Sequence, residues 1–284
     1  MLKIFLELST VCNHKCYFCT SSLSKNFIMT TEKFIEILDS APEEIQELIL
    51  TPSEGEIFMD PDILSKLEWI LNNRKIKLLS FHTNFTAISF QGIEFLKKFQ
   101  EKKSLLIYIS KYGETEDEFL RLTKTKSSQK FFKKYSNNIE YAKKIGLIVT
   151  EDYRGENYEF FSEDVPVYIE QKIKELGVCS NQFIIRIFTN LKVAQCICSG
   201  SYQNTAPGLI IGDLNNDSLI DILHNPKRYE LFKKHVKKDY PDYCLTCPNF
   251  GSAKINMTPS IIRQMLVGKH SSEGSKDVNT IENK

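Results

Sequence analysis

The sequence of 284 residues predicts an α/β fold, in which a partial (β/α)6 TIM-like barrel is followed by a small, cysteine-rich α+β domain. Strand-like and helix-like segments alternate through the first half, which is typical of right-handed βαβ units and a parallel sheet. Five such units can be traced, and a sixth strand is expected later. We expect the barrel at 1–168, the second domain at 169–267 and a disordered tail at 268–284.

The barrel elements follow from apolar periodicity and capping residues. Alternation of apolar and polar residues over 2–8 predicts the first strand. Thr30 is expected to cap the first helix, which runs to about residue 39. Further strands are expected at 47–51, 76–81, 105–110 and 147–150, and further helices at 60–73, 89–98 and 127–144.

The pattern changes after a predicted helix at 165–176. Segments 182–188 and 192–197 are expected to form a hairpin that turns at Thr189 and Asn190. Two more helices are expected at 217–223 and 226–238.

Composition excludes several classes of protein. A net charge of +1 and a pI near 7.5 give no field that would attract nucleic acid or an anionic membrane. Apolar runs are too short to span a bilayer, and Glu7 interrupts the apolar start, so no signal peptide is expected. The eight cysteines lie in tight groups, which favours metal binding in the cytoplasm over disulfides in a secreted chain.

One loop carries three cysteines in eight residues. Cys12, Cys16 and Cys19 have the spacing C-x3-C-x2-C directly after the first strand. Three thiolates on a four-iron cluster leave one iron without a protein ligand. An open coordination position distinguishes a reactive metal site from a closed structural one. The loop is therefore predicted to bind a small molecule at iron, and the alternative is a zinc knuckle or unrelated thiols.

This loop resembles the signature of the radical S-adenosylmethionine (SAM) superfamily, and Tyr17 matches the aromatic residue that often precedes the third cysteine. The resemblance implies that a 4Fe–4S cluster binds SAM at its open iron. It also implies that reduction cleaves SAM to a 5′-deoxyadenosyl radical, which takes a hydrogen atom from the substrate.

Three strand ends resemble weaker motifs of that superfamily, and barrel chemistry sits at the carboxyl ends of strands. The segment SEGEIFMDPDI resembles the GGEP motif, with Gly55 and Glu56 in place and Glu54 replacing the first glycine. The segment HTNFT resembles the TNG motif without its glycine, and places Asn84 near SAM. The segment YISKYG resembles the fourth-strand motif, with Ser110 near the SAM carboxylate or ribose.

The second group of cysteines resembles a Twitch domain, the short form of the SPASM domain. The implied ligands of an auxiliary 4Fe–4S cluster are Cys179, Cys196, Cys244 and Cys247, while Leu191 occupies a position where the pattern has glycine. Four thiolates would close this cluster to substrate and suit it to electron transfer. A structural zinc site is the alternative for the CLTC pair.

The leading hypothesis is a radical SAM oxidoreductase that acts on a small hydroxylated substrate of the sugar or aminocyclitol type. The auxiliary cluster would accept an electron, and Glu151, Arg154 or Lys111 would take the hydroxyl proton. A second hypothesis is a sugar or peptide epimerase in which Cys198 returns a hydrogen atom. Cys198 could equally be an inert thiol or exchange with Cys196 as a ligand. A third is a non-catalytic zinc-binding interaction module.

The expected partners follow from the leading hypothesis. They are a small-molecule substrate and a flavodoxin- or ferredoxin-type electron donor, with no nucleic acid and no membrane. No peptide-recognition segment is recognised before the barrel, which favours a small substrate over a peptide.

Overall fold

The computed structural model describes residues 2–16, 19, 26–42, 44–50, 55–73, 75–125, 128–154, 179, 184–196, 205–245 and 247. Among the predicted features, Tyr17, Glu54, Cys198, the helix at 165–176 and the tail at 268–284 lie outside these residues. The proposed boundary at 168/169 also lies outside them and stays a prediction.

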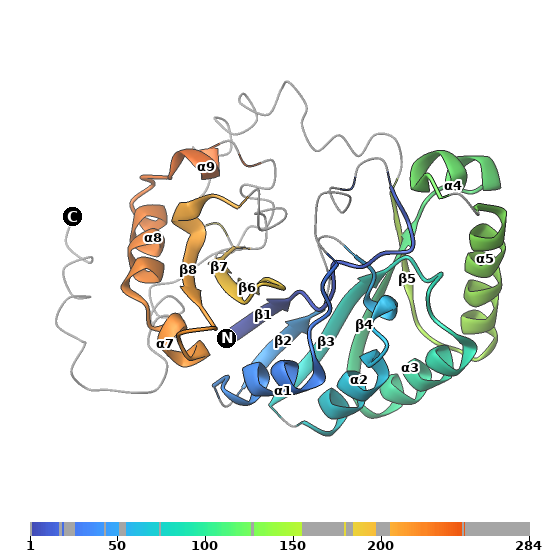
Figure 1. Ribbon diagram of the computed structural model, residues 1–284, viewed down its shortest axis with the longest axis horizontal. Helices are drawn as coiled ribbons and strands as arrows, with labels where there is room; N and C mark the ends of the chain where they lie inside the picture. Colours follow the sequence, from blue (N-terminus) through green and yellow to red (C-terminus); the bar gives the residue numbers. More distant parts are fainter. Residues whose placement is uncertain are drawn as a thin grey trace.

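One eight-stranded sheet runs through the molecule in the order β5-β4-β3-β2-β1-β6-β7-β8 (Figure 1). The pairs among β1 to β6 are all parallel, whereas β7 pairs antiparallel with both β6 and β8. The strands are β1 (Leu2–Leu6), β2 (Ile45–Ile49), β3 (Ile76–Thr83), β4 (Ser104–Lys111), β5 (Thr150–Tyr153), β6 (Ile184–Ile187), β7 (Lys192–Gln195) and β8 (Ile210–Asp213).

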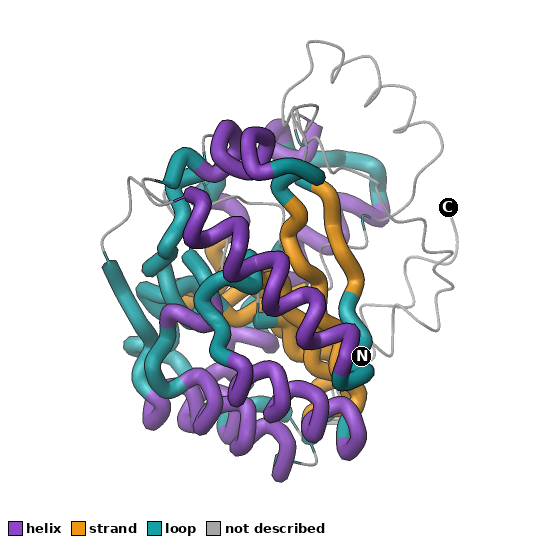
Figure 2. Tube along the Cα trace, turned by 90° about the vertical axis from the view of Figure 1, so that its right-hand side faces the viewer, coloured by secondary structure: helices purple, strands orange, loops and turns teal. Residues whose placement is uncertain are grey.

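The helices of the barrel half lie on one face of the sheet, and the view turned by 90° shows them as a layer over the strands (Figures 1 and 2). A short 3₁₀ helix at Ile57–Met59 precedes α2, and another at Pro207–Leu209 precedes β8. The α-helices are α1 (Thr31–Asp39), α2 (Ile63–Asn72), α3 (Phe90–Lys102), α4 (Glu116–Thr123), α5 (Ser128–Lys144), α7 (Leu219–Leu223), α8 (Pro226–Val236) and α9 (Asp242–Leu245).

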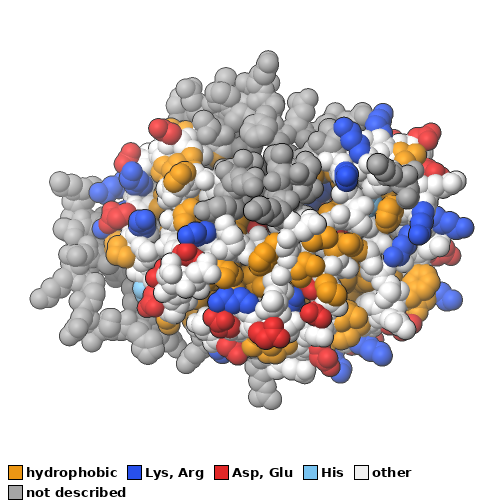
Figure 3. Space-filling view, viewed as in Figure 1, with side chains coloured by type: hydrophobic (Ala, Val, Ile, Leu, Met, Phe, Trp, Pro, Cys, Tyr) orange, Lys and Arg blue, Asp and Glu red, His pale blue; other side chains and the backbone are white. Residues whose placement is uncertain are grey.

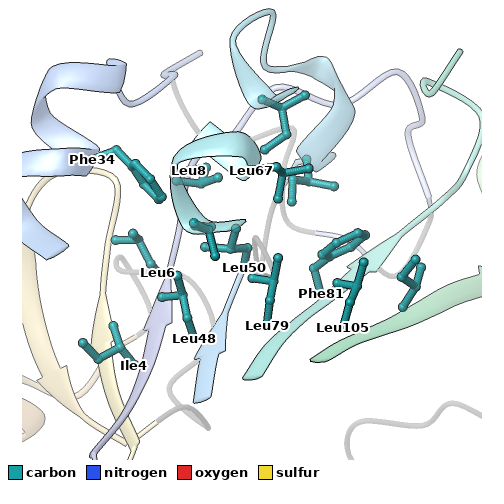
Figure 4. Close-up of a cluster of buried hydrophobic side chains, with 14 of the residues drawn as sticks. Ile4, Leu6, Leu8, Phe34, Leu48, Leu50, Leu67, Leu79, Phe81 and Leu105 are labelled. Atoms are coloured by element: carbon teal, nitrogen blue, oxygen red, sulfur yellow. The ribbon is translucent and has the colours of Figure 1, made fainter. Parts of the chain in front are cut away.

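The core lies between these helices and the sheet. Alternate strand residues such as Leu6, Leu48 and Phe81 point toward Phe34 of α1 and Leu67 of α2 (Figure 4). All five side chains are almost completely buried. Since side chains alternate along a strand, the residues between these positions face the opposite side, which we call the inner face.

The predicted partial barrel is confirmed, with three corrections. Strand β5 begins at Thr150, three residues later than predicted, because residues 147–149 do not pair with a neighbouring strand. Helix α4 was not predicted, although Thr115 and Glu118 form its capping box. The predicted hairpin joins the barrel sheet itself, since β6 pairs in parallel with β1.

No helix among the described residues has the length and apolar character needed to cross a membrane. On the face shown in Figure 3, basic and acidic side chains are interspersed with apolar ones.

Candidate active site

The cysteine loop leaves the sheet at the carboxyl end of β1. Its two arms meet again where the amide of Met29 donates to the carbonyl of Leu8 at 2.8 Å. Within the loop, the amide of Cys19 donates to the carbonyl of Cys16 at 3.0 Å, which forms a tight turn. The loop thus holds its cysteines over one strand end.

The thiols of this loop lie in a desolvated environment that suits a metal-bound thiolate. Burial raises the pKa of Cys12 and of Cys16 to about 12. The amide of His14 and the side-chain amide of Asn84 donate to Cys12 Sγ at 3.4 and 3.9 Å. A thiol that resists ionisation alone but has N–H donors aimed at its sulfur ionises once a metal cation supplies the opposing charge.

A hydrogen-bond network ties the loop to the end of β3. Asn84 Nδ2 donates to Asn13 Oδ1, and Asn13 Nδ2 donates to Thr86 Oγ1, both at 2.8 Å. His14 Nε2 lies 2.9 Å from the same hydroxyl. The predicted SAM contact Asn84 therefore also positions the cysteine loop.

Buried His14 is packed among aromatic rings. Its ring centroid lies 5.3 to 5.8 Å from those of Tyr112, Phe119 and Phe131. Burial lowers the pKa of His14 to about 4. These contacts describe a neutral core histidine, which agrees with an assignment of the loop's chemistry to its cysteines.

Gly55 and Glu56 bind the second strand-end loop to the first. The amide of Glu56 donates to the carbonyl of Val11 at 2.8 Å. Its buried carboxylate accepts from Thr83 Oγ1 at 2.5 Å and from the amide of Asn84 at 2.6 Å. Burial raises the pKa of Glu56 to about 7 against these hydrogen bonds. Glu56 thus joins three successive strand ends.

Replacing Gly55 with alanine is expected to lower SAM affinity at least tenfold. Gly55 has φ +117°, and an added Cβ would lie 2.5 Å from the backbone oxygen of Ser9, just before the cysteine loop. The loop must shift to make room. Titration calorimetry of reconstituted protein with SAM measures the change. Gly146→Ala is the matched control, because Gly146 also has positive φ (+71°) but nothing lies within 4 Å of the added Cβ.

Two residues that replace motif glycines keep a backbone conformation that favours glycine. Phe85, the residue after Thr83 and Asn84, has φ +58°, and Leu191 in the hairpin has φ +67°. A left-handed conformation costs a residue with a side chain roughly 1–2 kcal/mol. The fully buried ring of Phe85 and the core contacts of Leu191 offset this cost. Both positions thus keep the positive φ that a glycine would adopt, although neither residue is glycine.

A cluster of polar side chains lies on the inner face at the ends of β3, β4 and β5. The ring of His82 stacks on Tyr108, with centroids 4.8 Å apart and planes at 17°. His82 Nε2 lies 3.5 Å from Asp152 Oδ2, and Arg154 Nη2 lies 2.7 Å from the same carboxylate. Ser110 pairs with Asp152 in the strand register and so shares this face. We call His82, Tyr108, Asp152 and Arg154 the inner-face cluster.

The inner-face cluster is open enough to meet a ligand. The side chains of His82 and Asp152 are 31% and 37% exposed. Burial, followed by the charge of Arg154, lowers the pKa of His82, while Asp152 opposes that shift. A lowered pKa favours the neutral form of the ring at neutral pH. The sequence does not reveal Asp152 as part of this cluster, because the strand predicted at 147–150 ends before it.

The other two predicted bases lie elsewhere. Glu151 faces α5, where its carboxylate lies 3.4 Å from the hydroxyl of Tyr135 and 3.7 Å from Lys143 Nζ. Lys111 Nζ lies 3.5 Å from Glu151 and 2.5 Å from Glu114. Of the three predicted bases, the structure places Arg154 in the inner-face cluster.

Tyr112 lies between Ser110 and the cysteine loop. Burial raises the pKa of Tyr112 and its neighbour Ser110 opposes that shift, while Tyr112 in turn opposes the raised pKa of Cys16. Both residues are buried or nearly so. Ser110 thus lies between the inner face and the cysteine loop, and its predicted contact with SAM stays a prediction.

The second group of cysteines is brought together by the hairpin and the segment around α9. Burial raises the pKa of Cys244, and the thiols of Cys196, Cys179 and Cys247 raise it further. The amide of Cys247 donates to the carbonyl of Cys244 at 3.2 Å. Cys196 ends the hairpin with φ +122°. Four cysteines distant in sequence are therefore electrostatic neighbours.

Neither group of cysteines has the geometry of a single-ion site. Within the part of the chain that the structure describes, no three His, Cys, Asp or Glu side chains converge as ligands of one metal ion do. No two of the described cysteines are joined in a disulfide. Each thiolate of a four-iron cluster binds a different iron, so its cysteines stand apart. The two sets, of three and four thiols, fit such clusters.

Comparison with known proteins identifies two regions. A family model of the radical SAM superfamily matches residues 6–153, more than half of the chain. A model of an iron–sulfur cluster-binding domain, SPASM, matches residues 179–248. Comparison with curated protein sequences gives no match.

Several solved structures share the fold. Native anSMEcpe with bound AdoMet and Cp18Cys peptide is 16% identical, with a TM-score of 0.59 over 88% of this chain and 87% of that one. BtrN in complex with AdoMet and 2-DOIA is 13% identical, with a TM-score of 0.51 over 84% and 89%. SuiB from Streptococcus suis is 15% identical, with a TM-score of 0.55 over 87% and 70%. At these identities the likeness extends to the fold alone.

Proposed function

Since the chain belongs to the radical SAM superfamily and carries an iron–sulfur cluster-binding domain after its barrel, we propose that it oxidises a secondary alcohol of a small hydroxylated substrate to a carbonyl. The observation that carries this proposal is the inner-face cluster, with a neutral imidazole and a carboxylate at the carboxyl ends of three parallel strands.

The proposed ligands are Cys12, Cys16 and Cys19 for the SAM-binding cluster, and the four cysteines of the second group for the auxiliary cluster. When bound, SAM and the two clusters supply hydrogen-atom abstraction and a site that accepts one electron. The family implies these cofactors. The chain's own residues must orient the alcohol, exclude water and remove a proton.

A proton acceptor is what distinguishes this oxidation chemically. Conversion of an alcohol to a carbonyl removes one hydrogen atom from carbon, one electron and the hydroxyl proton. His82 would take that proton, Asp152 would orient the ring and Arg154 would hold the carboxylate, which their contacts support. The stacked Tyr108 and His82 rings form one apolar surface beside these polar groups, which suits a ring bearing hydroxyl groups.

The alternatives make different demands. A radical epimerase returns a hydrogen atom to the same carbon and needs no proton acceptor, and its proposed donor Cys198 lies outside the described residues. A zinc-binding interaction module is set aside, because the chain belongs to a superfamily of enzymes.

The test is an anaerobic reaction with SAM, reductant and a panel of aminocyclitols and sugars deuterated at their carbinol carbons. The proposed function predicts about eight irons per chain, deuterium in 5′-deoxyadenosine and a product that has lost one deuterium from carbon and one hydrogen from oxygen. An isomer of the substrate, in which a hydrogen derived from solvent replaces the deuterium on carbon, would instead identify an epimerase. A modified peptide and an inert sugar panel would contradict the proposed substrate class.

The pH dependence of turnover is expected to report the inner-face cluster. His82→Gln should lower kcat by about 10²-fold or more, because it removes the base. Arg154 lowers the pKa of His82 and Asp152 raises it, so the acid limb of the pH profile should move up in Arg154→Gln and down in Asp152→Asn. Single-turnover rates across pH measure both shifts. Limbs that do not move, or that move in one direction in both variants, would exclude His82 as the base.

A further inference from the structure

A histidine contacts the second group of cysteines. His235 lies in the last turn of α8, and its side chain is completely buried. Its Nε2 lies 3.4 Å from Cys244 Sγ. Its ring meets Tyr240 edge-on, with centroids 5.0 Å apart. The imidazole is thus held between an aromatic ring and a cysteine sulfur.

The contact is produced by the turn that follows α8. Lys238 has φ +58°, and the amides of Lys238 and Asp239 donate to the carbonyls of His235 and Lys234 at 3.1 and 2.9 Å. This left-handed cap reverses the chain and brings α9, which begins at Asp242, back over the end of α8. The turn therefore sets the distance between the histidine and Cys244.

The sulfur of Cys244 favours the tautomer of His235 that carries its proton on Nε2. Thiolate sulfur accepts hydrogen bonds, and the neutral imidazole tautomer with a proton on Nε2 is the one that can donate to it. A distance of 3.4 Å is within the range for a donor nitrogen and sulfur. Because His235 is buried, no bulk water competes for this sulfur along that direction.

We propose that His235 is a positioning residue of the auxiliary cluster, which donates from Nε2 to the Sγ of Cys244 and thereby raises the cluster's reduction potential. The inference rests on the proposed function, in which Cys244 is a ligand of the electron-accepting cluster. A cluster gains negative charge when it is reduced, and an N–H aimed at a ligand sulfur stabilises that charge. His235 makes the cluster a better acceptor for the electron that leaves the substrate.

The test isolates the auxiliary cluster in the full chain. Replacing Cys12, Cys16 and Cys19 with alanine removes the first site, and the reconstituted protein is titrated potentiometrically with EPR detection. In this background, His235→Leu is expected to lower the reduction potential of the auxiliary cluster by ~59 mV. For a one-electron step this is about a tenfold fall in the equilibrium constant for reduction. His235→Gln keeps an N–H donor and should restore much of the loss. His224→Leu, a change of the exposed histidine at the C-cap of α7, should leave the potential unaltered.

The outcomes separate the inference from the proposed function. An unchanged potential in His235→Leu, with four irons retained (~4 per chain), would overturn the role of His235 alone. No iron in the triple-alanine protein would remove the auxiliary cluster, and both proposals with it. If the EPR spectrum of the cluster showed a nitrogen hyperfine coupling as strong as that of a directly bound imidazole, His235 would be an iron ligand instead. If His235→Leu loses its cluster, the Gln variant still decides, because a donor role predicts a potential near that of the parent.

Discussion

Cys16→Ala is expected to abolish the reductive cleavage of SAM and to remove about four irons per chain. Cys16 is one of the three proposed ligands of the first cluster, and alanine has no side-chain atom that could bind iron in its place. Loss of the radical source should lower formation of 5′-deoxyadenosine at least 10³-fold, because binding and orientation alone cannot replace a cofactor's chemistry. Iron assay and chromatography of the SAM products measure the two effects.

Cys247→Ala provides the matched control. It should also remove about four irons, but the first site stays intact, so SAM is still cleaved under reduction while formation of the oxidised product stops. Cleavage that persists in Cys16→Ala would show that this cysteine is not a ligand. Loss of cleavage in both variants would indicate that the two cysteine groups fold as one unit.

Lys66→Met is expected to lower the free energy of unfolding by about 3–5 kcal/mol, because it leaves a carboxylate buried without its cation. Lys66 and Asp60 are both completely buried, and Nζ lies 2.5 Å from Oδ2. The same ammonium group donates to the carbonyl of Met29 at 2.6 Å. Lys66 thereby joins the return arm of the cysteine loop to the segment after Glu56, so SAM affinity should fall with stability.

Urea unfolding of anaerobically purified protein measures this loss. Asp60→Asn together with Lys66→Met should recover most of the stability, since no unpaired charge is then buried. Lys33→Met, which breaks a largely exposed pair with Glu36, should change stability by less than ~1 kcal/mol. Equal losses in Lys66→Met and Lys33→Met would contradict the account of the buried pair.

Sequence predicts the cysteine loop well and the inner-face cluster poorly, for a physical reason. The loop's ligands are set by local spacing, whereas His82, Tyr108 and Asp152 meet only through the register of three strands. A displacement of β5 by three residues was enough to remove Asp152 from the predicted site. Arg154 was predicted as one of three candidate bases but not as a partner of Asp152.

Other features are less visible in the sequence for a related reason. The pairing of β6 with β1 joins residues about 180 positions apart, and no local pattern specifies it. Leu191 and Phe85 keep left-handed backbones because of packing that the motif does not record. Helix α4, by contrast, carried a local signal in its capping box.

The position of β1 between β2 and β6 has a consequence for how the chain folds. Synthesis must pass residue 187 before both edges of the first strand can be paired. Until then β1 is an open edge that can pair with the wrong strand or another chain. Parallel pairing over so long a separation closes a large loop and is slow. The strand that precedes the cysteine loop is synthesised first but gains its second neighbour late, so we expect assembly of the first cluster to depend on folding of the hairpin.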